Sequence, residues 1–274
     1  MSWLQLEGRS AVVTGAGGGI GRATAVALAA AGCRVALLDR AADTLNETLA
    51  EIGAAGGQAL ALAADVSDPA SIEAAAAQAL AAHGPCDVLV NNAGVLRPGP
   101  LETLPLAEWN ALLAVNLTGY FVCAQVFGRQ MHGRQSQAGA GQAGALVHVA
   151  SIAAQHSTGF GGAYSVAKAG VVMLSRQLAT EWAPHSIRSN CVSPGMIHTP
   201  LSQAFYDQPG ATERRAATIP SGRIGQPQDI AEAVLFLASP RSAYVNGDEI
   251  VVDGGFTRNL MSFIPRAGYE DARG

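Results

Sequence analysis

Charged side chains are scarce in this chain of 274 residues, since Asp, Glu, Lys and Arg together make up 14% of it. An average soluble domain has about 25%. Disordered chains combine high charge with low hydrophobicity, so a chain with 49% hydrophobic residues is not one of them. The formal net charge is only −4, whereas nucleic-acid grooves and anionic membrane surfaces need clustered Lys and Arg. We therefore expect no nucleic-acid and no membrane partner.

Long apolar runs and paired cysteines are also missing. The apolar segments reach about 10 residues before a Gly, Thr, Asn or charge interrupts them, well short of the roughly 18 that a membrane span needs. The four cysteines form no CxxC pair, which predicts small buried side chains in a reducing compartment. The opening residues MSWLQLEGRS show no basic region followed by an apolar core, so we expect no secretory signal and a cytoplasmic protein.

What is present is a repeated alternation of short apolar runs with longer Ala-rich stretches. The runs, predicted as strands, are residues 11–14, 34–38, 87–91, 145–150, 187–192 and 250–252. The stretches, predicted as helices, are residues 20–31, 43–54, 69–82, 106–131, 163–182 and 227–238. Continuous apolar strands alternating with helices indicate βαβ units, in which a parallel sheet is covered on both faces. The fold class is therefore α/β and doubly wound, and residues 1–274 form a single domain because no Pro- and Ser-rich linker divides them.

Two segments break this alternation. Residues 133–144 are a low-complexity run of Gly, Gln and Ala, which we interpret as a surface loop. Residues 193–222 carry four prolines between a strand and the last helix. Long irregular segments at this point often cover a site, although ordinary surface packing explains the pattern equally well.

A glycine-rich turn follows the first strand, where AVVTGAGGGIG contains Gly15, Gly19 and Gly21. Glycines allow a tight turn and a close approach of the backbone to a pyrophosphate, which the first amides of the following helix then bind. The next strand ends in Asp39, about 20 residues on, where an acidic side chain accepts hydrogen bonds from the adenosine ribose and repels a 2′-phosphate. Arg40 is the counter-signal for NADP, and an acidic helix cap is the alternative role of Asp39. We predict NAD.

A tyrosine and a lysine stand four residues apart in YSVAK, at Tyr164 and Lys168, so both face one side of a helix. A phenol is a poor acid or base at neutral pH, and a neighbouring lysine cation lowers its pKa toward the working range. Ser151 follows the strand at 145–150, at the sheet edge where open α/β folds bind ligands. Taken alone, the pair is often a surface helix pair and Ser151 a turn cap; it is the combination that indicates proton transfer on an alcohol or carbonyl.

The motifs together resemble the short-chain dehydrogenase/reductase family, in its form of roughly 250 residues. The matching segments are TGAGGGIG (14–21), NNAG (91–94), VNLTG (115–119), YSVAK (164–168), SPGMIHT (193–199), GRIGQPQDIA (222–231) and VVDGG (251–255). They arrive in order and cover about residues 6–257. The resemblance implies a Rossmann-type, mostly parallel seven-stranded sheet, a nicotinamide cofactor and no metal.

It also implies a role for each matching residue. Tyr164 would be the general acid/base, Lys168 would bind the nicotinamide ribose, Ser151 would orient the substrate oxygen, and Asn116 would hold a water linking Lys168 to solvent. The cofactor would meet Gly15, Gly19, Ile20, Gly21, Asp39, Asp65, Val66, Asn92, Ala93, Gly94, Tyr164, Lys168, Pro194, Ile197 and Thr199.

Substrate contacts are expected from Leu96, His156, Phe160, Met196 and Phe205, a mostly apolar set that favours a neutral, apolar or cyclic secondary alcohol or ketone. Arg97 is the nearest candidate to anchor an anion, with simple solvent exposure as its alternative. A β-ketoacyl reductase and a sugar or polyol dehydrogenase remain alternatives within the family. A non-catalytic NAD-binding sensor remains outside it, although it would not need Ser151 and Tyr164 together.

Association is expected as well. The helices at 106–131 and 163–182 form dimer contacts in the family, whose members are commonly homotetramers, while core burial would explain their apolar character equally well. The extension at 258–274 contains Leu260, Met261, Phe263 and Ile264. We predict that it packs on its own core or on a neighbouring subunit.

Overall fold

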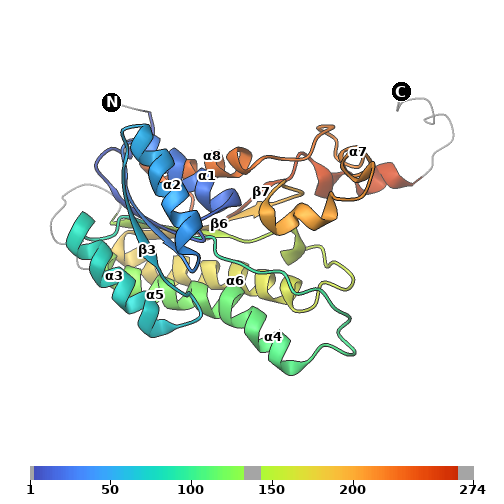
Figure 1. Ribbon diagram of the computed structural model, residues 1–274, viewed down its shortest axis with the longest axis horizontal. Helices are drawn as coiled ribbons and strands as arrows, with labels where there is room; N and C mark the ends of the chain where they lie inside the picture. Colours follow the sequence, from blue (N-terminus) through green and yellow to red (C-terminus); the bar gives the residue numbers. More distant parts are fainter. Residues whose placement is uncertain (1–2, 133–142, 265–274) are drawn as a thin grey trace.

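The apolar runs form the strands of one sheet, in the order β3-β2-β1-β4-β5-β6-β7 (Figure 1). This computed structural model describes residues 3–132 and 143–264. The strands are β1 (Ser10–Thr14), β2 (Arg34–Asp39), β3 (Gln58–Ala63), β4 (Val88–Asn91), β5 (Gly144–Val149), β6 (Ile187–Pro194) and β7 (Glu249–Val252). Every neighbouring pair is parallel, so the doubly wound α/β fold is confirmed and the described sheet is wholly rather than mostly parallel.

Helices cover both faces of this sheet (Figure 1). One face carries α1 (Gly19–Ala30), α2 (Ala42–Ala54) and α8 (Pro227–Ala238), and the other carries α3 (Pro69–His83), α5 (Gly119–His132) and α6 (Tyr164–Trp182). Side chains alternate between the two faces along a strand: Val13 of β1 belongs to the cluster with Leu28 of α1, and Val12 to the cluster with Phe127 of α5. The small apolar residues therefore fill two core layers.

Two elements differ from the sequence-based expectation. The strand β3 was not predicted, because its sequence QALALA is rich in residues that strands disfavour and only one of its six side chains is buried at the sheet edge. The helix expected at 106–131 is divided into α4 (Leu106–Leu113), a π-helical turn η1 (Ala114–Thr118) and α5. Gly119 lies at the end of this turn, where a Cβ would come 2.9 Å from the Val66 carbonyl oxygen.

The continuous helical stretch Leu106–His132 is long and apolar enough to span a membrane by length and composition. Half of its most apolar window is buried within the fold, where α5 packs against α3, β4 and β5. Gly, Thr, Asn and charged residues divide the sequence of this helix into shorter apolar runs. Packing within the fold therefore accounts for half of this apolar window.

The sheet order reverses between β1 and β4, whose loops leave the sheet on opposite sides. Ligands of doubly wound folds bind at the carboxyl ends of the strands, at this switch point. The proline-containing segment 193–222 forms a 3₁₀ helix η4 (Pro200–Phe205) and a short helix α7 (Ala211–Ala216) beyond the end of β6. Most of the Gly/Gln loop (133–142) and most of the extension (265–274) lie outside the described residues.

Candidate active site

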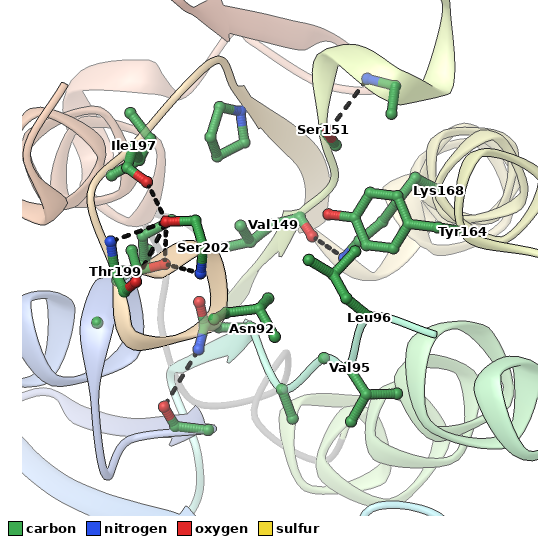
Figure 2. Close-up of a pocket in the computed structure, with 18 of the residues that line it drawn as sticks. Asn92, Val95, Leu96, Val149, Ser151, Tyr164, Lys168, Ile197, Thr199 and Ser202 are labelled. Carbon is green, nitrogen blue, oxygen red and sulfur yellow. Dashed lines mark hydrogen bonds between the residues drawn. The ribbon is translucent and has the colours of Figure 1, made fainter. Parts of the chain in front are cut away.

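A cavity of about 760 Å³ runs along the carboxyl ends of the strands. It extends from the glycine turn after β1, past β4 and β5, to the segment after β6. Figure 2 shows Ser151, Tyr164 and Lys168 on one side of it and Ile197, Thr199 and Ser202 on another. Its volume is within the range of cofactor and small-molecule sites.

The glycine turn presents backbone amides to the cavity. Helix α1 begins after Gly18, which provides no side-chain cap, so the first amides of the helix remain available for an anion. Gly15, Gly18, Gly19 and Ile20 line the cavity. Gly21 does not; a Cβ there would lie 1.9 Å from the Gly15 carbonyl oxygen, so this glycine allows the turn to close rather than contacting a ligand.

Asp39 at the end of β2 fixes the neighbouring backbone. Its carboxylate accepts hydrogen bonds from the amides of Gly17 (3.1 Å) and Ala41 (3.2 Å). It therefore fixes the backbone just before α2 and also faces the glycine turn. Its role toward an adenosine ribose stays a prediction. Arg40 forms an ion pair with Asp65 at 3.6 Å. The acidic side chain at the turn thus remains without a cation.

The opposite end of the cavity holds a hydroxyl and a phenol. The Ser151 hydroxyl accepts a hydrogen bond from the Ala153 amide at 3.1 Å, as expected of a turn cap, and its own proton remains free to donate. Burial raises the pKa of the Tyr164 phenol, and the Ser151 hydroxyl acts against this rise. The expected lowering of this pKa by Lys168 is not found in the free chain, where the lysine Nζ lies 5.8 Å from the centre of the phenol ring.

Lys168 is held by two groups of the chain itself. Its Nζ donates to the Val149 carbonyl at 2.8 Å and to the hydroxyl of Tyr120 at 3.1 Å. Tyr120 is 1% exposed and donates its own proton to the same carbonyl at 3.0 Å. An ammonium has three donors, so one remains for a ligand. Burial lowers the pKa of Lys168 to about 8.

Replacing Tyr120 with Phe is expected to move the alkaline loss of enzymatic activity to lower pH. Lys168 is charged below its pKa of about 8, and the Tyr120 hydroxyl stabilises the charged form by accepting one of its hydrogen bonds. Without that acceptor the pKa falls further. A hydrogen bond to a charged group corresponds to a shift of about one pH unit. The pH dependence of kcat/KM for both proteins measures it.

The control is the thermal midpoint of unfolding of the same variant. Phe keeps the ring that stacks on His148 at 6.1 Å, so the two proteins should unfold at similar temperatures. A variant with reduced stability and an unchanged alkaline limb would show that Tyr120 has only a packing role.

Asn116 lies in the π-helical turn and does not line the cavity. It is fully buried, and its amide group makes two hydrogen bonds with Val95, from the Val95 amide to Oδ1 at 2.9 Å and from Nδ2 to the Val95 carbonyl at 3.0 Å. Val95 and Leu96 do line the cavity. In this structure Asn116 therefore positions the loop after β4.

A hydrogen-bonded turn fixes the segment after β6. Thr199 and Ser202 form a capping box at the start of η4, and the Ser202 hydroxyl donates to the Ile197 carbonyl at 2.7 Å (Figure 2). All three residues line the cavity. The proline-containing segment thus forms part of the cavity wall.

The structure brings most of the sequence-predicted site residues together. The cavity is lined by Gly15, Gly19, Ile20, Asp39, Asp65, Val66, Asn92, Ala93, Gly94, Leu96, Ser151, Phe160, Tyr164, Lys168, Pro194, Met196, Ile197, Thr199 and Phe205. Besides Gly21 and Asn116, it does not include His156, which is exposed in the turn that follows Ser151. Arg97 is also outside it and is paired with Glu108.

Two residues at the site escaped the sequence analysis. Tyr120 was one apolar position among many in a helical stretch, and its hydroxyl meets Lys168 only in the folded chain, where α5 and α6 lie on the same face of the sheet. Arg215 lies in the short helix α7 and lines the cavity. The sequence around Arg215 shows no helical or strand periodicity that could predict its position. The only indication was a cation within the irregular segment after the sixth strand.

The cavity thus combines backbone donors for an anion at one end with a hydroxyl, a phenol and an ammonium at the other. This set can bind a dinucleotide and move a proton to or from an oxygen. Among residues 3–132 and 143–264, no three His, Cys, Asp or Glu side chains are grouped so as to hold a metal ion. The four cysteines are buried and free.

Comparison with known proteins agrees with this geometry. The family model described as enoyl-(acyl carrier protein) reductase matches residues 15–257. D-threitol dehydrogenase of Mycolicibacterium smegmatis is 41% identical, over 93% of this chain and 95% of its own. Galactitol 2-dehydrogenase (L-tagatose-forming) of Cereibacter sphaeroides is 39% identical, over 93% and 97%.

A solved structure is similar along its whole length. The gluconate 5-dehydrogenase of Burkholderia cenocepacia, in complex with NADP and tartrate, has a TM-score of 0.86 and 33% identity, and the match covers 93% of this chain and 97% of that one. The chain therefore belongs to the short-chain dehydrogenase/reductase family of oxidoreductases, which use a nicotinamide cofactor.

Proposed function

We propose that this protein is an NAD-dependent oxidoreductase that interconverts a secondary alcohol and a ketone. The observation that carries the proposal is one continuous cavity, with the glycine turn and Asp39 at one end and Ser151, Tyr164 and Lys168 at the other. A dinucleotide can extend from the glycine turn to the proton-transfer groups. These groups would then meet the substrate next to the nicotinamide of the cofactor.

Ser151, Tyr164 and Lys168 have different roles at the reacting oxygen. Ser151 donates its free proton to the substrate oxygen and orients it. Tyr164 accepts the hydroxyl proton during oxidation and returns a proton to the carbonyl oxygen during reduction. Its raised pKa keeps the phenol protonated at neutral pH, which is the form that reduction needs. Lys168 uses its third donor for the ribose and favours the phenolate once it is drawn closer.

The cofactor fits the residues at the other end. The uncapped start of α1 and the glycines of the turn would bind the pyrophosphate, and Asp39 would accept hydrogen bonds from the adenosine ribose. A bound nicotinamide would supply the acceptor or donor of hydride at the carbinol carbon. NAD is favoured over NADP because the Asp39 carboxylate faces the glycine turn, whereas Arg40 is paired with Asp65.

Similar proteins are named for different alcohols, so the reaction does not by itself identify the substrate class. The two similar enzymes above are named for polyols, and the solved structure for a sugar acid with NADP. A polyol or sugar dehydrogenase therefore remains the alternative with direct support, while a β-ketoacyl reductase would usually prefer NADPH, which Asp39 opposes. A non-catalytic NAD-binding sensor would give Ser151 and Tyr164 no task.

The experiment is a panel of secondary alcohols, polyols, hydroxy acids and the matching ketones, followed by the absorbance of the reduced nicotinamide at 340 nm. Both NAD and NADP are included. Turnover with NAD on at least one member supports the proposal. Tight binding of NAD without turnover on any member would favour the sensor.

We also propose that the protein works as a homotetramer. Val166 and Met173 lie seven residues apart on α6 and are 49% and 59% exposed, and Phe121 on α5 is 43% exposed. In the extension, Leu260, Met261, Phe263 and Ile264 are likewise exposed rather than packed on the core of the chain. We expect these side chains to be buried by neighbouring subunits. Light scattering should give four times the mass of the chain, and the mass of a single chain would contradict the proposal.

A further inference from the structure

The charges that line the cavity differ between its two ends. The carboxylates are Asp39 and Asp65, which follow β2 and β3 at the end next to the glycine turn. Three cations also line the cavity: Arg40 is paired with Asp65, Lys168 lies in α6, and Arg215 lies in α7, in the segment after β6. Among the described residues, Lys168 and Arg215 are therefore the cavity cations without a carboxylate partner.

Arg215 is held by aromatic rings and not by a counter-ion. Its guanidinium carbon lies 5.0 Å from the ring centre of Phe205 and 5.3 Å from that of Tyr206, and the residue is half-buried. Within residues 3–132 and 143–264, no ion pair or side-chain hydrogen bond of Arg215 is found.

Three arginines outside the cavity form ion pairs with carboxylates. Arg97 is paired with Glu108, Arg129 with Glu73 and Arg223 with Asp229, and none of these arginines lines the cavity. A guanidinium has five donors in a planar fork that matches a carboxylate. An arginine that is partly removed from water and has no anion beside it retains its full capacity to bind one.

Apolar side chains surround this cation. The Phe205 ring contacts its guanidinium, and Phe160, Met196 and Leu201 line the same cavity. Phe160 adopts a left-handed backbone conformation with φ of 61° and is 76% exposed, an arrangement rare for an aromatic residue. The site thus offers an apolar surface for the body of a ligand and one fixed cation for its charge.

We propose that Arg215 is a specificity-determining residue that binds a carboxylate, so that the substrate is a hydroxy acid or keto acid with an apolar body. The inference rests on the proposed function, because it names the substrate class of the same site. It replaces the neutral substrate that the sequence favoured, since the sequence could not place Arg215 in the cavity. Arg97, the anchor considered there, is already paired and lies outside.

Binding of an unreactive acid tests the proposal without turnover. Calorimetry measures the affinity of cyclohexanecarboxylate and of its neutral analogue cyclohexanecarboxamide for the protein with NADH. We expect the acid to bind at least tenfold more tightly than the amide. Arg215→Met should weaken the acid by 10- to 100-fold and leave the amide within twofold, because a hydrogen-bonded ion pair is lost. Arg215→Lys should recover part of the loss.

Arg214→Met is the matched control. Arg214 is the neighbouring residue of α7, is exposed, and donates to the Pro209 carbonyl at 3.0 Å outside the cavity. Its replacement should leave the affinity for the acid unchanged. Equal affinity of the wild type for acid and amide, or equal weakening of both by Arg215→Met, would overturn the proposal.

Turnover provides the second measurement. With 4-hydroxycyclohexanecarboxylate and its methyl ester, Arg215→Met should raise KM for the acid by 10- to 100-fold and change KM for the ester little. An increase of KM for NAD instead would assign Arg215 to the cofactor and overturn the proposal. Absence of any turnover combined with the expected binding results would contradict the proposed function and leave the carboxylate site intact.

Discussion

Replacing Tyr164 with Phe is expected to lower kcat by roughly 10²- to 10⁴-fold, the contribution typical of a positioned acid or base. The change removes one oxygen and keeps the ring, so the wall of the cavity remains. What is lost is the proton that must leave the substrate hydroxyl or reach the carbonyl oxygen. Initial rates with NAD or NADH and the best substrate of the panel measure the effect.

Two further measurements make this result specific. Titration of NADH should give similar affinities for the wild type and Tyr164→Phe, because Lys168 and the glycine turn are untouched. Tyr206→Phe removes a different phenol that lines the same cavity and should lower kcat less than tenfold. If Tyr164→Phe keeps more than a tenth of the wild-type rate, Tyr164 is not the acid/base.

The fold could be predicted because its signals are local and repeated. Buried parallel strands produce continuous apolar runs, and the motifs between them stand at sharp turns that only certain residues allow. Gly21 illustrates this, since any side chain there would collide with the Gly15 carbonyl. The edge strand β3 has a weaker pattern because it is only partly buried, and it was missed for that reason.

Parts of the site could not be predicted, since they depend on contacts between distant segments. Tyr120 and Lys168 are 48 residues apart and belong to different helices, α5 and α6, so their hydrogen bond forms only in the folded chain. Arg215 lies in α7, a helix of six residues, which is too short to show a helical periodicity in the sequence. His156 illustrates the opposite error, because nearness in sequence to Ser151 did not bring it into the cavity.

The choice of cofactor gives the second large effect. A 2′-phosphate placed beside the Asp39 carboxylate would bring like charges within a few ångströms, which costs about 4 kcal/mol per pair of unit charges at 4 Å near a protein surface. We therefore expect the wild type to prefer NAD over NADP by at least ~10²-fold in kcat/KM. Asp39→Asn should reduce this preference at least tenfold, since it removes the charge. Gly17 and Ala41 donate to different oxygens of the Asp39 carboxylate, so the single oxygen of an asparagine keeps one of these two hydrogen bonds.

Arg40→Met separates the two residues that compete for this role. Arg40 has a side chain 66% exposed and is directed to Asp65, so its loss should change the ratio of kcat/KM for the two cofactors less than threefold. Were Arg40 to bind the 2′-phosphate, the wild type would accept NADP well and Arg40→Met would abolish that activity. If Asp39 sets the preference, Asp39→Asn lowers the ratio of kcat/KM for NAD to that for NADP and Arg40→Met leaves it nearly unchanged. If Arg40 binds the 2′-phosphate, Arg40→Met raises this ratio. Kinetics with both cofactors therefore decide which side chain sets the preference.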